Sequence, residues 1–252
     1  MNGDFIALLP KPNLAQLGTS AACPEHLQAT TVFAFHCKEG VVIAGDHRAT
    51  AGNIIFSDKT EKILELDSHS LMAIAGVPAT AFEMARTLQT SFEFYRRSQL
   101  QSMSLKAKIR ALSRLLRDNL PATLQGFGIV QPIFAGVEVD DPNAKPVIFF
   151  YDPLGAQFEA ATYAGSGSGS GSIKSVLHYL ERWGKPRPAE MSVDEAITLA
   201  TRLLMTAAEF DAATGGVHPD RSLFATIKLL TREGTRSIPL DEMERCWKES
   251  CA

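Results

Sequence analysis

The sequence predicts an α+β fold in which two antiparallel sheets pack face to face between two layers of helices. Segments of strand and helix character alternate as strands, two helices, strands, two helices and a final strand. Many of the strand segments are apolar on both faces, so both faces of each sheet are expected to be covered. No change of composition after residue 30 marks a boundary, so one domain is expected there.

The first half of the chain accounts for the first strands and the first pair of helices. Short apolar, β-branched strands are expected at residues 30–37, 41–46, 61–66 and 70–76, with a further one at NIIF. Glu39-Gly40 predicts a hairpin between the first two strands. The pattern becomes helical over residues 79–100. It is helical again from Ser104 to the residue before Pro121, because proline ends a helix.

The second half repeats this order. Strands are expected at residues 129–139, 147–151, 157–164 and 223–230. A helix is expected at IKSVLHYLERW, where one apolar stripe contains Ile173, Val176, Leu177, Leu180 and Trp183. The next helix is expected to begin at a capping box of Ser192 and Glu195 and to end near Gly215-Gly216.

A Gly-Ser run, GSGSGSGS at residues 165–172, reads either as a linker or as a turn of a functional site. It stands between a predicted strand and a predicted helix, which favours the turn. A glycine-rich turn that begins a helix presents backbone N–H groups, which can hold an anion. The run does not match GxGxxG. It also fails the P-loop pattern, because Ile173 stands where that pattern needs glycine, so a nucleotide site is not expected.

Composition excludes several classes of protein. A net charge of −3 and a pI near 6.1 argue against binding of nucleic acid. No apolar run is long enough to span a membrane, and MNGDFIALLPKP is a poor secretory signal, so a cytoplasmic protein with reduced cysteines is expected. The six histidines form no HxH or HxxxH pair, and neither a metal nor a cofactor is expected.

The segment before the first strand has a different character. Residues 1–29 show no periodicity, and we interpret them as a leader that ends where Thr30-Thr31 begin the first strand. Threonine is common in strands for its β-propensity alone. A threonine exposed by cleavage can also use its hydroxyl as a nucleophile and its own α-amino group as a base. A free α-amino group has a pKa of about 7.7–8.0, which suits a general base.

The stretch TTVFAF…GVVIAGDHRATAGNIIFSDKTEKI…AIAG resembles the beginning of a mature proteasome β subunit of the bacterial, actinobacterial type, an N-terminal-nucleophile hydrolase. The resemblance runs from Thr30 to about Ile238. Asp46 lies 16 residues after Thr30, and Lys62 lies 32 residues after it, as the catalytic Asp and Lys of the family do. The resemblance places further catalytic roles at Gly76 for the oxyanion and at Asp211, Thr214 and Ser168, with Ser166 as the alternative serine.

The resemblance also implies how these residues act. The Lys62 ammonium would favour alkoxide character at the Thr30 hydroxyl, and Asp46 would keep Lys62 charged and oriented. Arg48 is expected to be a structural partner of the turn. The implied substrate pocket is uncharged, so apolar side chains are expected before the cut bond; its residues are Ala49, Thr50, Thr60, Ile74, Pro78 and Phe82.

The family implies a threonine endopeptidase with the N-terminal-nucleophile fold, formed by residues 30–252 after removal of residues 1–29. The cut would fall between Ala29 and Thr30, where the family usually has Gly before the threonine. It implies two stacked β rings with seven-fold symmetry, α-subunit rings, an ATPase ring and unfolded protein substrates, with neither nucleic acid nor membrane as partner.

Two alternatives to the peptidase stay open. The first is an amidase of the same fold with a small-molecule substrate, against which the Gly-Ser turn and the DAATGG segment count. The second is a non-catalytic ring subunit, against which the joint presence of Thr30, Asp46 and Lys62 counts.

Overall fold

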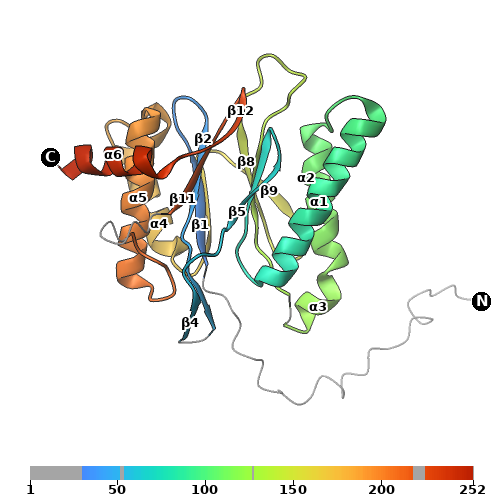
Figure 1. Cartoon of the computed structure of the whole chain (residues 1–252), viewed down its shortest axis with the longest axis horizontal. Helices are drawn as coiled ribbons and strands as arrows, with labels where there is room; N and C mark the ends of the chain where they lie inside the picture. Colours follow the sequence, from blue (N-terminus) through green and yellow to red (C-terminus); the bar gives the residue numbers. More distant parts are fainter. Residues whose placement is uncertain (1–29, 52–53, 127, 218–224, 252) are drawn as a thin grey trace, which may run out of the picture.

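A computed structural model describes residues 30–51, 54–126, 128–217 and 225–251 of the chain. The described residues form two five-stranded antiparallel sheets and a separate two-stranded hairpin. Figure 1 shows the two sheets face to face, with α4, α5 and α6 beside one sheet and α1, α2 and α3 beside the other. The chain therefore combines helices with antiparallel sheets, which confirms the predicted α+β class.

The first sheet consists, in spatial order, of β10 (Tyr163–Gly167), β1 (Thr31–His36), β2 (Val41–Gly45), β11 (Thr226–Thr231) and β12 (Gly234–Ser237). The second consists of β5 (Ile63–Asp67), β6 (Ser70–Ala73), β7 (Ile133–Gly136), β8 (Val147–Tyr151) and β9 (Gln157–Ala160). The hairpin pairs β3 (Ala49–Ala51) with β4 (Ile54–Ser57). The helices are α1 (Pro78–Gln99), α2 (Leu105–Asp118), α3 (Leu120–Leu124), α4 (Ser170–Trp183), α5 (Val193–Phe210) and α6 (Leu240–Cys251), with a 3₁₀ turn at Pro188–Glu190.

Strand β1 shows why the central strands are apolar on both faces. Side chains alternate between the two faces of a strand. Phe33 and Phe35 belong to the apolar cluster that packs against α4, α5 and α6, whereas Val32 and Ala34 belong to the cluster between the sheets. A third cluster joins the second sheet to α1 and α2 through residues such as Leu88 and Leu112. Three apolar interfaces thus hold the layers together.

Local sequence signals place the helices around this core. Ser192 and Glu195 form the predicted capping box at the start of α5, in which each residue's side chain accepts a hydrogen bond from the backbone N–H of the other. In α4 the predicted apolar stripe is buried at Ile173 and Leu177. Trp183, at the end of that stripe, is instead 62% exposed and packs against Tyr179.

Several observed elements differ from the predicted ones, and the short elements β3 and α3 were not predicted at all. The single strand expected at residues 157–164 is two strands in different sheets, because the chain crosses from β9 to β10 after Ala160. Helix α5 ends at Phe210, five residues before the predicted glycine pair, because Asp211 adopts an extended conformation. The expected closing strand is followed by β12 and α6, which the sequence prediction missed.

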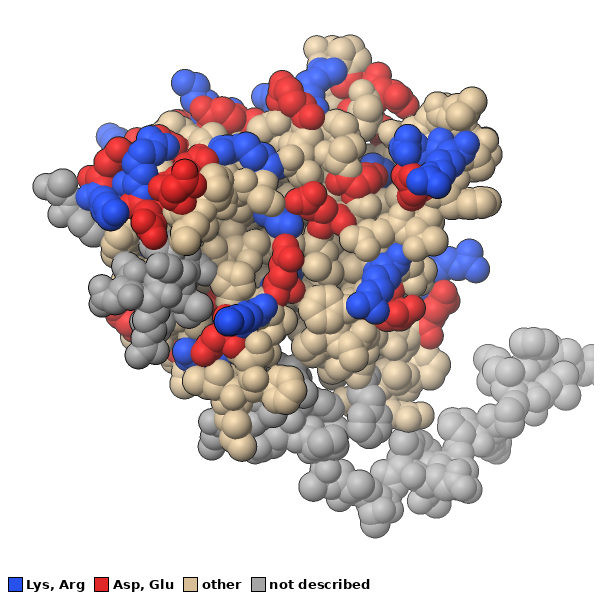
Figure 2. Space-filling model, viewed as in Figure 1, with Lys and Arg blue, Asp and Glu red and all other residues tan. Residues whose placement is uncertain are grey.

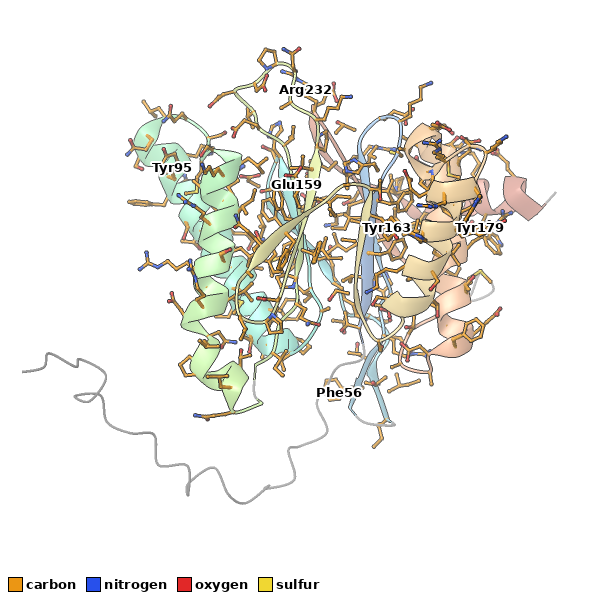
Figure 3. All side chains as sticks on the ribbon, turned by 180° about the vertical axis from the view of Figure 1, so that it is seen from behind. Phe56, Tyr95, Glu159, Tyr163, Tyr179 and Arg232 are labelled. Atoms are coloured by element: carbon orange, nitrogen blue, oxygen red, sulfur yellow. The ribbon has the colours of Figure 1, made fainter. Side chains whose placement is uncertain are left out.

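The β3–β4 hairpin lies apart from the two five-stranded sheets (Figure 1). Its second strand exposes three large apolar side chains, Ile54, Ile55 and Phe56, the last of which is 80% exposed. Figure 3 shows Phe56 at the end of the molecule where this hairpin extends from the sheets.

Figure 2 shows acidic and basic side chains mixed over the visible face rather than segregated by sign.

Candidate active site

The centre of the candidate site is a buried ion pair between Lys62 and Asp46. Lys62 Nζ lies 2.6 Å from Asp46 Oδ1 and also donates to the carbonyl of Arg48 at 2.5 Å. The Lys62 side chain is 2% exposed, and that of Asp46 is fully buried. Burial lowers the pKa of the Lys62 ammonium from its ordinary value, and the Asp46 carboxylate opposes that shift by raising the pKa.

The Asp46 carboxylate is fully engaged. Besides Lys62, its Oδ1 accepts from the backbone N–H of Thr31 at 2.9 Å. Its Oδ2 accepts from the backbone N–H of Arg48 and of Gly215, each at 2.9 Å. Four donors, three of them from distant parts of the chain, thus converge on one buried carboxylate, which fixes Lys62 beside the beginning of β1.

The two adjacent threonines at the beginning of β1 have different surroundings. Thr31 is wholly buried, and its hydroxyl contacts Thr214 Oγ1 at 2.6 Å and accepts from Gly169 N at 3.0 Å. The carbonyl of Thr30 accepts from Ser168 N at 3.1 Å. Among the described residues, the hydroxyl of Thr30 has no hydrogen-bond partner. The predicted cleavage bond after Ala29 lies outside the described residues, as do residues 1–29.

The Gly-Ser run does contribute a serine to the same centre. Ser168 Oγ donates to Asp211 Oδ2 at 2.5 Å, and Thr214 Oγ1 donates to the same oxygen at 2.6 Å. Ser166, the alternative serine, donates instead to the carbonyl of Gln131 at 2.8 Å. The structure therefore brings Ser168 together with Asp211 and Thr214. Through the Thr31 hydroxyl, this group is joined to the residues around Asp46.

The Gly-Ser run is a strand-to-helix turn between β10 and α4, as predicted. Gly167 has a φ of +94°, and a Cβ there would lie 1.6 Å from the carbonyl oxygen of Thr30. A side chain at Gly167 is therefore excluded both by the backbone conformation and by the contact with Thr30. Gly171, in the first turn of α4, would place a Cβ in open space.

The backbone N–H of Gly76 takes no part in the hydrogen bonds that pair its segment with the segment around Val130. It forms an isolated antiparallel bridge with Val130, and the flanking hydrogen bonds are Val77 N to Ile129 O and Gln131 N to Ala75 O. Gly76 and Val130 thus form a non-hydrogen-bonded pair, in which neither residue bonds to the backbone of the other. Its φ is +113°, and a Cβ would lie 2.1 Å from the carbonyl of Ile129, so the position requires glycine.

The six residues predicted to form the substrate pocket come from three places in the fold. Ala49 and Thr50 lie on β3; Thr60 precedes β5, and its N–H donates to the carbonyl of His47. Ile74 follows β6 and shares an apolar cluster with Phe82 on α1, the helix that begins at Pro78.

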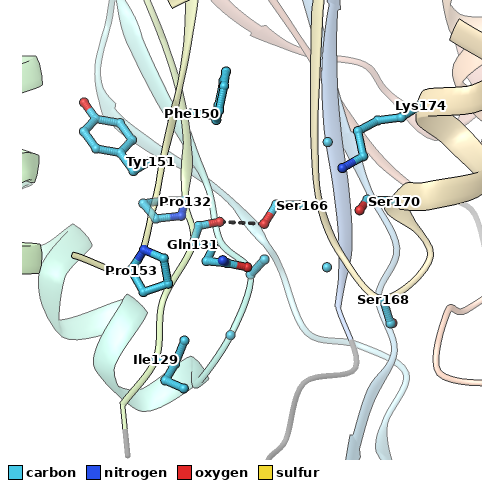
Figure 4. Close-up of a pocket in the computed structure, with 14 residues that line it drawn as sticks. Ile129, Gln131, Pro132, Phe150, Tyr151, Pro153, Ser166, Ser168, Ser170 and Lys174 are labelled. Carbon is cyan, nitrogen blue, oxygen red and sulfur yellow. Dashed lines mark hydrogen bonds between the residues drawn. The ribbon is translucent and has the colours of Figure 1, made fainter. Parts of the chain in front are cut away.

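None of these six lines the cavity of about 590 Å³ beside the site, which Figure 4 shows in close-up. That cavity is lined, among others, by Gly76, Phe150, Ser168 and Lys174.

Sequence reasoning missed several contributors to the site. Thr31 was read as a strand residue, yet its N–H and its hydroxyl join the Asp46 group to the Asp211 group. The carbonyl of Arg48 binds Lys62, while the Arg48 guanidinium contacts Asp58 and the carbonyl of Ala212. Such backbone contacts leave no residue-type signal, because any residue offers the same N–H and carbonyl groups.

The described residues contain neither a candidate metal site nor a candidate membrane-spanning helix. No group of three or more His, Cys, Asp or Glu side chains is placed to hold a metal ion in that part of the chain. No helix among the described residues is long and apolar enough to cross a membrane.

Comparisons with known proteins show the family of the chain. Residues 27–218 match the family model described as proteasome subunit. The chain is 38% identical over 217 residues to "Proteasome subunit beta" of Stackebrandtia nassauensis, which covers 85% of this chain and 75% of the relative. It is 37% identical over 220 residues to "Proteasome subunit beta 2" of Thermomonospora curvata, covering 87% of this chain and 75% of the relative. The chain belongs to the proteasome subunit family.

Gly167→Ala and Gly171→Ala form a matched pair within one turn. We expect Gly167→Ala to destabilise the fold by more than about 2 kcal/mol, because a residue at positive φ is strained and the new Cβ meets Thr30. Gly171→Ala should instead stabilise by about 0.5 kcal/mol, because its helical site is open. Thermal denaturation of both variants measures the difference. Equal melting temperatures would contradict the described turn.

Proposed function

We propose that the chain is a β-type subunit of a proteasome core particle and that it cuts peptide bonds with the Thr30 hydroxyl as nucleophile. One observation carries the proposal: Asp46 Oδ1 accepts hydrogen bonds from both Lys62 Nζ and Thr31 N. A buried ammonium is thereby held next to the residue that follows Thr30. The names of the relatives and the family match support the peptidase class.

The proposed reaction begins when the Thr30 hydroxyl attacks the substrate carbonyl and its proton passes to the α-amino group of Thr30. The charge of Lys62 favours the developing alkoxide, and the unused N–H of Gly76 stabilises the oxyanion. Collapse of the intermediate transfers the proton to the leaving amine, breaks the peptide bond and leaves an ester on Thr30. Water then hydrolyses that ester, and the α-amino group again accepts and returns the proton.

Thr30 is a better nucleophile than its neighbour on structural grounds. The hydroxyl of Thr31 is engaged by Thr214 and Gly169, and the residue is 0% exposed. In the proposed mechanism, Ser168, Asp211 and Thr214 orient the amino end of the mature chain. Their shared contact at Asp211 Oδ2 and the bond from Ser168 N to Thr30 O support that role.

The proposal includes assembly into stacked seven-membered β rings capped by α-subunit rings, with an ATPase ring that delivers unfolded proteins. The exposed apolar side chains of Ile54, Ile55 and Phe56 support burial of this hairpin in an assembly, because such patches mark interaction sites. We also propose that the arrangement in Figure 1 is the four-layer αββα sandwich of N-terminal-nucleophile hydrolases. We also propose that the protein functions in the cytoplasm.

Lys62→Ala should abolish peptide hydrolysis by the assembled particle, at a cost of about 3 kcal/mol or more in the activation barrier. The fold should survive, because Asp46 keeps three backbone N–H donors, from Thr31, Arg48 and Gly215. Fluorogenic peptides measure the rate, and native mass checks the assembly.

Lys108→Ala is the matched control, since Lys108 is also buried and pairs with Asp67 at 2.7 Å, on the other side of the fold. It removes a buried ammonium of the same kind without touching the candidate site. If the assembled Lys62→Ala particle keeps activity within tenfold of the unmodified particle, the catalytic role of Lys62 is refuted. Equal losses of activity in the Lys62→Ala and Lys108→Ala particles would refute it as well.

We further propose that residues 1–29 are removed by cleavage between Ala29 and Thr30. While that bond is intact, the nitrogen of Thr30 is an amide and cannot act as a base. The Thr30 hydroxyl would attack the carbonyl of Ala29, while Lys62 and the N–H of Gly76 stabilise the developing negative charge. The peptide bond to Thr30 then breaks, its nitrogen takes the hydroxyl proton, and water hydrolyses the ester left on the Thr30 oxygen. Intact-mass analysis of the assembled particle should therefore give a chain that starts at Thr30. An active particle whose chains all still start at Met1 would refute the mechanism.

The proposed substrate pocket is formed by Ala49, Thr50, Thr60, Ile74, Pro78 and Phe82. None of them is charged, so apolar side chains should be preferred immediately before the cut bond. The preference should be broad, because one methylene in such a pocket is worth only about 1–3 kcal/mol. A panel of fluorogenic peptides with leucine, glutamate or arginine at that position tests it, and a dominant rate for glutamate or arginine would overturn it.

A further inference from the structure

The cavity beside the candidate site has two unlike walls. One wall is largely apolar and includes Ile129, Pro132, Phe150 and Pro153, with Gln131 and Tyr151 beside them. The other is formed by β10 and the first turns of α4 and carries hydroxyl groups and one amine (Figure 4). Among the described lining residues, Lys174 carries the only charge. An open cavity of about 590 Å³ with a single cation on one wall favours a negatively charged group over a positively charged one.

Lys174 and Ser170 both present unused donors to this space. They are four residues apart at the start of α4, so they share one helix face. Ser170 is only 6% exposed, yet in the described part of the chain its hydroxyl has no hydrogen-bond partner. Lys174 likewise forms no ion pair with any described residue. In Figure 4 the Lys174 amine and the Ser170 hydroxyl lie next to each other at the edge of the cavity.

The stem of Lys174 is held in place by the turn itself. A Cβ on Gly165 would lie 3.2 Å from Lys174 Cγ, which shows that the methylene chain passes directly over this glycine. The neighbouring Ser166 hydroxyl is committed to the carbonyl of Gln131 and leaves the amine free. The ammonium is therefore directed toward the cavity rather than along the helix surface.

The cavity also borders the groups that the proposed mechanism uses. Gly76 and Ser168 both line it, whereas none of the six residues of the proposed substrate pocket does. The side chain before the cut bond is assigned to that other pocket. That assignment leaves this cavity available to the residue that follows the cut bond, on the leaving side of the peptide.

We propose that Lys174 and Ser170 form a subsite that selects an acidic side chain on the residue immediately after the cut bond. The inference rests on the proposed function and adds a substrate preference to it. The substrate carboxylate would pair with Lys174 Nζ and accept a hydrogen bond from Ser170 Oγ. Because Lys174 is solvent-exposed, the gain should be about three- to fivefold rather than orders of magnitude.

The test uses internally quenched peptides of one sequence, with leucine before the cut and glutamate, glutamine or lysine after it. All have amidated C-termini, and mass spectrometry verifies the cut position. The assembled particle should show a kcat/KM for the glutamate peptide about three- to fivefold above that for glutamine. Lys174→Ala should bring this ratio to about one, Ser170→Ala should reduce it, and Lys174→Glu should make lysine the preferred residue.

Lys106→Glu is the control of matched charge, since Lys106 is exposed on α2 and does not line the cavity. It should keep the ratio of the unmodified particle. A glutamate-to-glutamine ratio of one or less in the unmodified particle would overturn the subsite. The same holds for a ratio that Lys174→Glu leaves unchanged, or for a preference that appears only with a free C-terminal carboxylate.

Thr30→Ala separates the two proposals. If that particle cuts every peptide as fast as the unmodified one, the proposed function itself fails. If Thr30 is required but the glutamate preference is missing, only the subsite fails.

Discussion

The site depends on one buried carboxylate. Asp46 accepts hydrogen bonds from Thr31, Arg48, Lys62 and Gly215, which lie at the start of β1, before β3, before β5 and after α5. Burying an ion pair gains little net stability, because desolvation of the charges offsets their attraction. The pair instead fixes the positions of the chain segments that meet around Asp46. Each of the four donors satisfies part of one buried charge, so the segments that carry them are held together around Asp46.

That arrangement explains why the Lys62 amine occupies its place. Its burial disfavours the charged form, and Asp46 together with the carbonyl of Arg48 compensates for the lost water. A second group, Ser168, Asp211 and Thr214, is joined to the first through the hydroxyl of Thr31, and the Arg48 guanidinium adds bonds to the carbonyls of Ala212 and Thr214. Thr31 therefore contacts both clusters, through its N–H on one side and its hydroxyl on the other.

Part of this could be predicted from the sequence, and the reasons for success and failure are physical. The α+β class and the capping box at Ser192 follow from local periodicity and residue type, and both can be recognised directly in the sequence. The change of sheet between β9 and β10 does not, because residues 157–164 look equally strand-like on both sides of the crossing. Asp46 and Lys62 were singled out because their spacing from Thr30 matches that of the family which the sequence resembles. The backbone donors of Gly169 and Gly215 were not, because a backbone N–H has no residue-type signal.

The Gly-Ser run has a fixed length although its composition repeats. Deleting one Gly-Ser pair would restore glycine and serine at every position of the turn, so its chemistry would look unchanged. The residues of α4 would nevertheless advance by two positions, or about 200° around the helix axis. Ile173 and Leu177 would rotate out of the core, and Lys174 would turn away from the cavity. The number of Gly-Ser repeats therefore sets the rotation of α4 about its axis. The identity of the repeated residues does not.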